Sequence, residues 1–159
     1  MTNFTGMGIH IKAKDIQVSR RFYESLGFSP VFGYGDDDFR ASLPDGCGSA
    51  PERYRGLSYK LCDGCELEIA EGHIAVKQEV FSETIPSPKV SGMIRVESLV
   101  PIIEAAKDEI SFPVRKYYWG SIEVALKDPD GFVLVFITPY SEEEFTKIKA
   151  LIDIEVVEP

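Results

Sequence analysis

Positive charge is scarce in this chain. It has 17 Lys and Arg residues against 26 Asp and Glu residues, which gives a formal net charge of -9 at pH 7. Binding to phosphate groups requires a basic surface, so this deficit argues against nucleic acid as a partner. The excess of acid confers solubility, and it would also suit a pocket for cationic ligands.

Long hydrophobic runs and common nucleotide-binding or hydrolase motifs are also missing. No apolar run approaches the length of a membrane span, and Met1 to Lys12 lacks the layout of a signal peptide. We therefore expect a cytoplasmic protein with no membrane partner. The sequence contains neither a phosphate-binding glycine loop nor a G-x-S-x-G motif.

Cysteine is sparse, and the three residues are an odd number, which argues against a disulfide framework. Cys62 and Cys65 match the spacing of a C-x-x-C metal knuckle, for which Cys47 and His73 are possible further ligands. The same two residues flank a hairpin turn, where small side chains simply fit. We favour this second interpretation.

What the sequence does contain is a repeated hairpin. Ser121 to Leu126 alternates polar and apolar residues, Asp128-Pro129-Asp130-Gly131 has turn chemistry, and a β-branched and aromatic run follows. Earlier in the chain, Leu57 to Leu61 and Glu66 to Glu71 flank Cys62-Asp63-Gly64-Cys65. Each pair of segments predicts two strands joined by an Asp-Gly turn.

The repetition extends upstream of both hairpins. A strand from Gly8 to Ala13 leads into a helix opened by Asp15, and a strand from Ser91 to Val96 leads into a helix opened by Ser98. Each half therefore predicts the order β-α-β-β-β, in an α+β fold. We expect one domain over residues 1–159, made of repeat one at about 6–71, a linker at about 72–89 and repeat two at about 90–138. Repeat one should contain a long loop at 33–55. A C-terminal helix should follow at about 141–152, opened by the capping box Ser141-Glu142-Glu143-Glu144.

Two of these segments carry a family resemblance. The stretch from Asp15 to Gly27, which ends in Leu26-Gly27-Phe28, followed much later by Asp128-Pro129-Asp130-Gly131, resembles the vicinal oxygen chelate superfamily. That group holds glyoxalase I, bleomycin-resistance proteins, extradiol dioxygenases and fosfomycin-resistance transferases. The resemblance implies a curled mixed sheet with helices on its outer face, a substrate cleft on the inner face, and a homodimer.

Strand parity divides the predicted sheet into two faces. One face is apolar throughout and should pack against the helices: Ile9, Ile11, Leu67, Ile69, Ile94, Val96, Ile122, Val124, Leu126, Leu134 and Phe136. The other face mixes charged, small and apolar residues, as a ligand-binding face would. Its members include His10, Glu68, Arg95 and Glu123, the expected floor of a cleft, and Tyr118 or Trp119 should form a wall.

The resemblance also raises the question of a metal. Metal-dependent members of the family bind a divalent ion with His and Glu ligands, and the matching positions here are Gly8, Glu68, Ser91 and Val135. Only Glu68 is of ligand type, so the resemblance implies that the family's metal site has been lost here, and no cofactor is expected. A displaced metal site made of His10, Glu68 and Glu123 stays open as an alternative.

These observations favour a small-molecule-binding protein similar to the bleomycin-resistance branch. Its ligand would be amphipathic and in part cationic, because carboxylates and aromatic faces both attract cations. Two alternatives remain. One is an enzyme of the lyase, isomerase or dioxygenase type that uses the displaced metal or His10 as a general base beside Glu68. The other is a structural or regulatory dimer.

Overall fold

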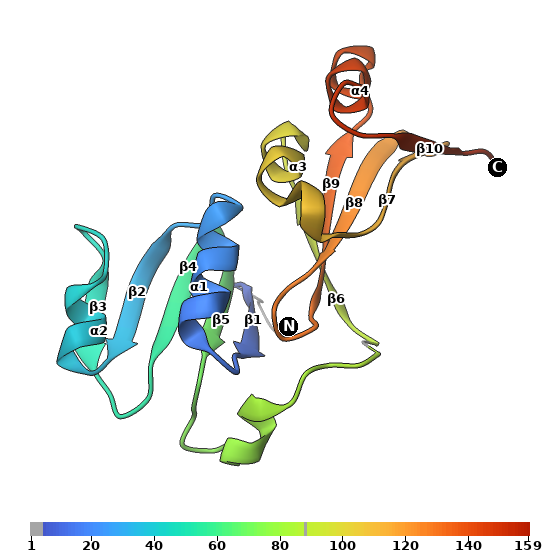
Figure 1. Cartoon of the computed structure of the whole chain (residues 1–159). Helices are drawn as coiled ribbons and strands as arrows, with labels where there is room; N and C mark the ends of the chain where they lie inside the picture. Colours follow the sequence, from blue (N-terminus) through green and yellow to red (C-terminus); the bar gives the residue numbers. More distant parts are fainter. Residues whose placement is uncertain (1–4, 88) are drawn as a thin grey trace. The chain divides into compact units, whose positions relative to one another are not determined.

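The computed structural model describes residues 5–87 and 89–159, so Pro88 of the expected linker lies outside the described residues. The chain divides into two compact units, Met1–Thr84 and Ile85–Pro159. Each unit contains one β-α-β-β-β repeat and one mixed sheet (Figure 1). The α+β class and the two repeats expected from the sequence are confirmed.

The first unit builds a sheet in the order β1-β5-β4-β2-β3. Strand β1 runs parallel to β5, and β3 runs parallel to β2, whereas the β2–β4 and β4–β5 pairs are antiparallel. The elements are β1 (Met7–Lys12), α1 (Ile16–Ser25), β2 (Pro30–Gly35), α2 (Asp37–Ala41), β3 (Gly48–Pro51), β4 (Gly56–Cys62), β5 (Cys65–Ala70) and a short 3-10 helix, η1 (Gln78–Ser82).

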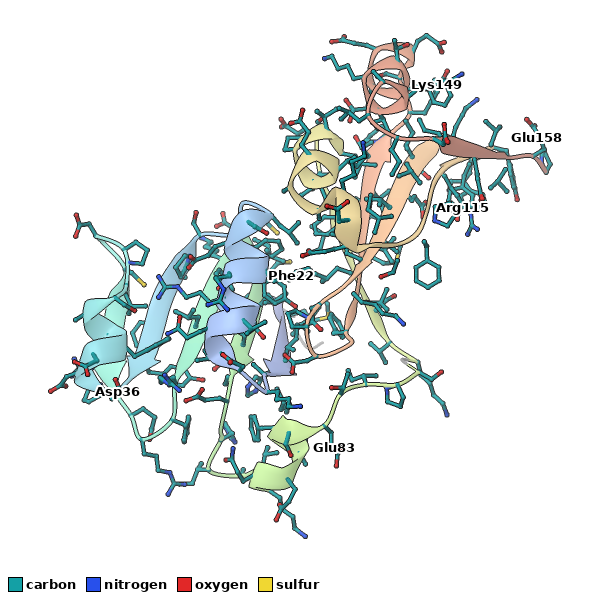
Figure 2. The ribbon with its side chains drawn as sticks, viewed as in Figure 1. Phe22, Asp36, Glu83, Arg115, Lys149 and Glu158 are labelled. Carbon is teal, nitrogen blue, oxygen red and sulfur yellow. The ribbon has the colours of Figure 1, made fainter. Side chains whose placement is uncertain are left out.

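The prediction of a structureless loop over residues 33–55 is wrong. The segment contains the end of β2, the helix α2 and the strand β3. Asp36, labelled in Figure 2, caps α2 because its Oδ1 accepts a hydrogen bond from the backbone N–H of Phe39 at 2.8 Å. A helix of five residues and a strand of four are too short to show a hydrophobic period, so pattern analysis missed both.

The second unit builds a sheet in the order β10-β7-β8-β9-β6. Strands β6 and β10 are its edges, and each runs parallel to its neighbour. The elements are β6 (Ser91–Arg95), α3 (Val100–Ala106), a 3-10 turn η2 (Lys107–Glu109), β7 (Ile110–Tyr117), β8 (Ser121–Lys127), β9 (Val133–Pro139), α4 (Glu142–Lys149) and β10 (Ile154–Val157).

The C-terminal helix expected over 141–152 is shorter than predicted, and the strand β10 follows it. Ser141 caps α4 through its hydroxyl, which accepts the N–H of Glu144 at 3.1 Å. The Glu144 carboxylate does not complete a capping box. Its Oε1 instead accepts the hydroxyl of Ser98 at 2.9 Å and the N–H of Leu99 at 2.7 Å. The buried carboxylate therefore ties α4 to the start of α3.

Burial follows the strand parity expected from the sequence for most of these residues, although Ile9, Ile94 and Val96 are only partly buried. On the apolar face, Leu67, Ile69, Ile122, Leu126 and Leu134 are fully buried. In the first unit α1 covers this face, where the ring of Tyr23 lies 5.9 Å from that of Tyr59 on β4. The opposite face is open in both units, since Glu66, Met93 and Arg95 are exposed.

An Asp-Gly turn closes the hairpin of each repeat on a glycine with positive φ. Gly64 has φ +75°, and Gly131 has φ +88°. Both turns lie against chain that comes before the first strand of the repeat. A Cβ added at Gly64 would lie 2.5 Å from the carbonyl oxygen of Thr5, and one added at Gly131 would lie 2.5 Å from that of Ile85. Glycine is required at both positions by its backbone angle and by this close approach.

Gly131→Ala should destabilise the protein by more than about 2 kcal/mol, because the new methyl group meets a backbone carbonyl and φ is strained. Gly120→Ala is the matched control. It has the same φ of +88° in the same unit, but nothing lies within 4 Å of its added Cβ. The control should lose only the conformational cost of about 1 kcal/mol. Urea unfolding midpoints measure the loss of stability in both variants. An equal loss in Gly131→Ala and Gly120→Ala would contradict the close approach at Gly131.

Candidate functional site

The open face of the first sheet brings His10 and Glu68 together. The parallel register of β1 and β5 pairs the two residues directly, and Ser58 on β4 pairs with Glu68 from the other side. The three side chains therefore share one rung of the sheet and one face. His10 and Glu68, which the sequence analysis expected on the floor of the cleft, are therefore neighbours.

Aromatic residues from outside the β1–β5 pair surround this rung. The hydroxyl of Tyr34, on β2, donates a hydrogen bond to Oε1 of Glu68 at 2.5 Å. The ring of Tyr34 lies 5.9 Å from that of Tyr54, which lies 6.5 Å from that of His73. The ring of His73 is 5.8 Å from that of His10. We call His10, Tyr34, Tyr54, Glu68 and His73 the first-unit cluster.

The surroundings of His10 favour its neutral imidazole. Burial, the largest cause, lowers the pKa of His10 below its ordinary 6.5, the carboxylate of Glu68 opposes it, and the nearby Lys12 and His73 act in the same direction as burial. Its Nε2 is buried and has no hydrogen-bond partner among the described residues. A neutral imidazole with such a nitrogen is able to accept a proton or a hydrogen bond from a ligand.

The register also tests the family's metal positions. Glu68 pairs with His10 rather than with Gly8, and Val135 pairs with Met93 rather than with Ser91. The rung in the first unit thus offers one imidazole and one carboxylate, and that carboxylate already accepts the Tyr34 hydroxyl. Within residues 5–87 and 89–159, no three His, Cys, Asp or Glu side chains are grouped so that they could hold a metal ion. These residues do not fit a divalent metal, and no catalytic step through one follows from them.

The other candidate ligands from the sequence are dispersed. Cys47 lies between α2 and β3, where its thiol donates to the carbonyl of Gly48 at 3.5 Å. His73, in the linker, is half-buried, and its ring lies 5.8 Å from that of His10. Neither residue joins Cys62 and Cys65 in a group of three.

The open face of the second sheet carries a pocket of about 660 Å³. Strands β6, β8 and β9 and the turn before β8 supply its walls. We call it the second-unit pocket, and its lining includes Met93, Arg95, Glu97, Trp119, Ser121, Glu123, Ile137 and Thr138. Its size lies within the range of about 300–1,000 Å³ that is usual for small-molecule sites.

Trp119 is fixed at one side of this pocket. Its indole stacks on the ring of Tyr117 with centroids 4.2 Å apart and an interplanar angle of 11°. The indole N–H donates to the hydroxyl of Ser121 at 2.8 Å, and Ser121 donates in turn to Oε1 of Glu123 at 2.7 Å. The ring is nevertheless 57% exposed. The pocket therefore has a flat aromatic surface that is oriented before any ligand arrives.

The sequence selected part of each site. In the second unit, Arg95, Trp119 and Glu123 line one pocket, whereas Tyr118 is outside its lining and stands edge-on to Trp119 at 4.9 Å. In the first unit, His10 and Glu68 were selected, but Tyr34 and Tyr54 were missed. Tyr34 follows a register shift in the β2–β4 pair, and Tyr54 comes from the loop between β3 and β4. Strand parity carries no signal for either.

The lowered pKa of His10 predicts how stability depends on pH. The folded protein binds this proton more weakly than the unfolded chain, so the contribution of His10 is present above about pH 6.5 and is lost as the pH falls towards its lowered pKa. When the pH is lowered from about 7.5 to about 5.5, the free energy of unfolding measured with urea should fall further for the unaltered protein than for His10→Gln.

A histidine NMR titration checks the same prediction directly. The chain has only two histidines, so His73→Gln assigns the remaining imidazole signal to His10. A His10 pKa at or above 6.5 would contradict the neutral imidazole.

Comparison with known proteins finds matches among solved structures. No protein-family model matches the sequence, and no curated protein matches it. Among solved structures, a glyoxalase/bleomycin resistance protein from Catenulispora acidiphila matches with a TM-score of 0.55 and 19% identity, over 86% of this chain and 99% of that one. No helix among the described residues is long and apolar enough to cross a membrane.

Two further structures match over similar lengths. A fosfomycin resistance protein from Listeria monocytogenes, solved with Mn(II) and sulfate, gives a TM-score of 0.51 and 14% identity, over 92% of this chain and 98% of that one. A bleomycin-binding protein solved with bleomycin gives 0.50 and 21%, over 87% of this chain and 100% of that one. At these identities the likeness concerns the fold.

Proposed function

We propose that this chain, which has the fold of the vicinal oxygen chelate superfamily, binds a small organic molecule in the second-unit pocket. The observation that carries the proposal is a pocket of about 660 Å³ whose wall is the oriented ring of Trp119 and whose polar groups include Arg95 and Glu123. The bleomycin-binding protein is a structural neighbour that was solved with an organic ligand, which supports the same kind of function.

The lining favours an amphipathic ligand with a flat part. The exposed face of Trp119 offers stacking, and Met93 and Ile137 offer apolar surface. Glu97 and Glu123 place two carboxylates against the single guanidinium of Arg95. A ligand with a positive or hydrogen-bond-donating group satisfies these carboxylates, and contact of a cation with the indole adds about 0.5–2 kcal/mol.

The chain offers its own reporter for this binding. Trp119 is the only tryptophan, so emission excited selectively from tryptophan, away from the absorption of the seven tyrosines, reports on the pocket. Titration with flat organic cations should change the emission, and matched anions of the same size should have a smaller effect. If only the anions change it, Arg95 is the anchor and the preference for cations is wrong.

Glu123→Gln should weaken binding of the best cation by about three- to tenfold at low salt and by less at high salt, since ions screen a partly solvated charge. Glu104→Gln is the matched control. It makes the same change on the exposed side of α3, outside the lining of the pocket, and should leave the affinity unchanged. Equal weakening in both variants would show a long-range effect of net charge.

The alternative function is an enzyme built on the first-unit cluster. The observation in its favour is the neutral imidazole of His10, whose Nε2 is buried beside a carboxylate that is held by Tyr34. His10 would act there as a general base on a bound substrate, as expected from the sequence. The homodimer and the cytoplasmic location expected from the sequence remain part of the proposal.

Metal content tests whether the first-unit cluster is a metal-dependent enzyme site. We expect the purified protein, prepared without a histidine tag, to contain much less than one transition metal ion per chain by elemental analysis, because one imidazole and one carboxylate hold such an ion weakly. About one metal per chain, lost in both His10→Ala and Glu68→Ala, would overturn this expectation and favour the enzyme.

A further inference from the structure

Two cysteines face each other at the tip of the β4–β5 hairpin in the first unit. Cys62 is the last residue of β4, and Cys65 is the first residue of β5. The antiparallel register pairs them directly across the turn Asp63-Gly64. The second-unit pocket and the first-unit cluster contain neither residue.

The geometry of the pair suits a covalent link. The two residues are direct partners in the β4–β5 pairing and stand at the two ends of a two-residue turn, so their thiols lie close together in the reduced protein. Directly paired residues of antiparallel strands have Cα atoms about 4.5–5.5 Å apart, and disulfides span Cα distances of about 4.4–6.8 Å. The expected separation of the two Cα atoms therefore falls within the range that a disulfide spans.

Access distinguishes Cys62 from the other two cysteines. Cys62 is exposed, whereas Cys65 and Cys47 are half-buried. An incoming reagent would thus meet Cys62 first, with Cys65 behind it as the second thiol. Cys47 lies elsewhere, between α2 and β3, with Arg20 and Glu24 as its charged neighbours.

The groups around Cys62 affect the rate of such a reaction. The neighbouring Cys65 thiol is the main cause that raises the pKa of Cys62, and the charge of Asp63 adds to it while that of Lys60 opposes it. Lys60 and Asp63 also form an ion pair at 2.7 Å. Because the thiolate is the nucleophile, the rate should increase with pH through the alkaline range.

The turn that holds the pair is also the point where the chain enters β1. The N–H of Met7 donates to the carbonyl of Gly64 at 2.7 Å, and Gly64 lies against Thr5 and Gly6. A covalent bond across the turn would therefore fix the residues against which the start of β1 is held.

We propose that Cys62 and Cys65 are a reversible dithiol–disulfide site that exchanges with low-molecular-weight disulfides. The thiolate of Cys62 attacks one sulfur of a disulfide such as oxidised glutathione and releases one glutathione thiolate. The thiolate of Cys65 then attacks Sγ of Cys62 and releases the second glutathione. The protein loses two protons and two electrons, and both electrons pass to the glutathione.

The test is thiol counting and intact mass of the full chain after treatment with oxidised glutathione. The unaltered protein should lose the mass of two hydrogen atoms and keep one of its three thiols. Peptide mapping should find a bond between Cys62 and Cys65, and dithiothreitol should reverse it. The rate should increase as the pH is raised.

Variants identify each step. Cys65→Ser should stop at the mixed disulfide and gain the mass of one glutathione. Cys47→Ser should close the bond as the unaltered protein does. A stable mixed disulfide on the unaltered protein, a bond that involves Cys47, or a disulfide between two chains would each overturn the proposal. All these outcomes can be distinguished from failure of the ligand-binding function, because they are read without any ligand of the second-unit pocket.

Discussion

Each unit depends on a glycine turn that lies against the backbone preceding its own first strand. In the first unit the carbonyl of Gly64 accepts the N–H of Met7, and in the second unit the carbonyl of Asp130 accepts the N–H of Ile85. The turn of the second unit is reinforced by the buried carboxylate of Asp128, which accepts the N–H groups of Asp130 at 3.0 Å and Phe132 at 2.7 Å. A side chain at either glycine would push the two segments apart, so only glycine fits at these two positions.

Once the turns are fixed, the alternation of side chains along each strand decides which face of the sheet can bind a ligand. Side chains alternate, so the register that buries Leu67 and Ile69 under α1 necessarily presents Glu66 and Glu68 on the other side. The parallel pairing of β1 with β5 then brings His10 beside Glu68. The polar character of the open face is thus a consequence of the same register that forms the core.

Strand parity is also the limit of what the sequence predicts. It identified the core and selected His10, Glu68, Arg95 and Glu123, because all four lie on regular strands. It missed β10, a strand of four residues that follows directly on α4, since apolar residues at 151 and 152 also fit a helical stripe. It missed Tyr34 and Tyr54 as well, because a register shift and a loop deliver them. Positions such as these depend on how strands and loops pair in the folded protein, and a local sequence pattern does not predict that pairing.

The two repeats share their topology and differ in the chemistry of equivalent rungs. The pair of His10 and Glu68 in the first unit has its counterpart in Met93 and Val135 of the second, where neither side chain titrates. The second unit has instead a pocket with an oriented indole, built around residues of β6, β8 and β9. The imidazole whose Nε2 has no hydrogen-bond partner among the described residues and the pocket with an oriented indole are therefore located in different repeats. A ligand bound in the second-unit pocket would be selected by stacking and by its charge, whereas His10, the residue proposed as a general base, belongs to the first-unit cluster.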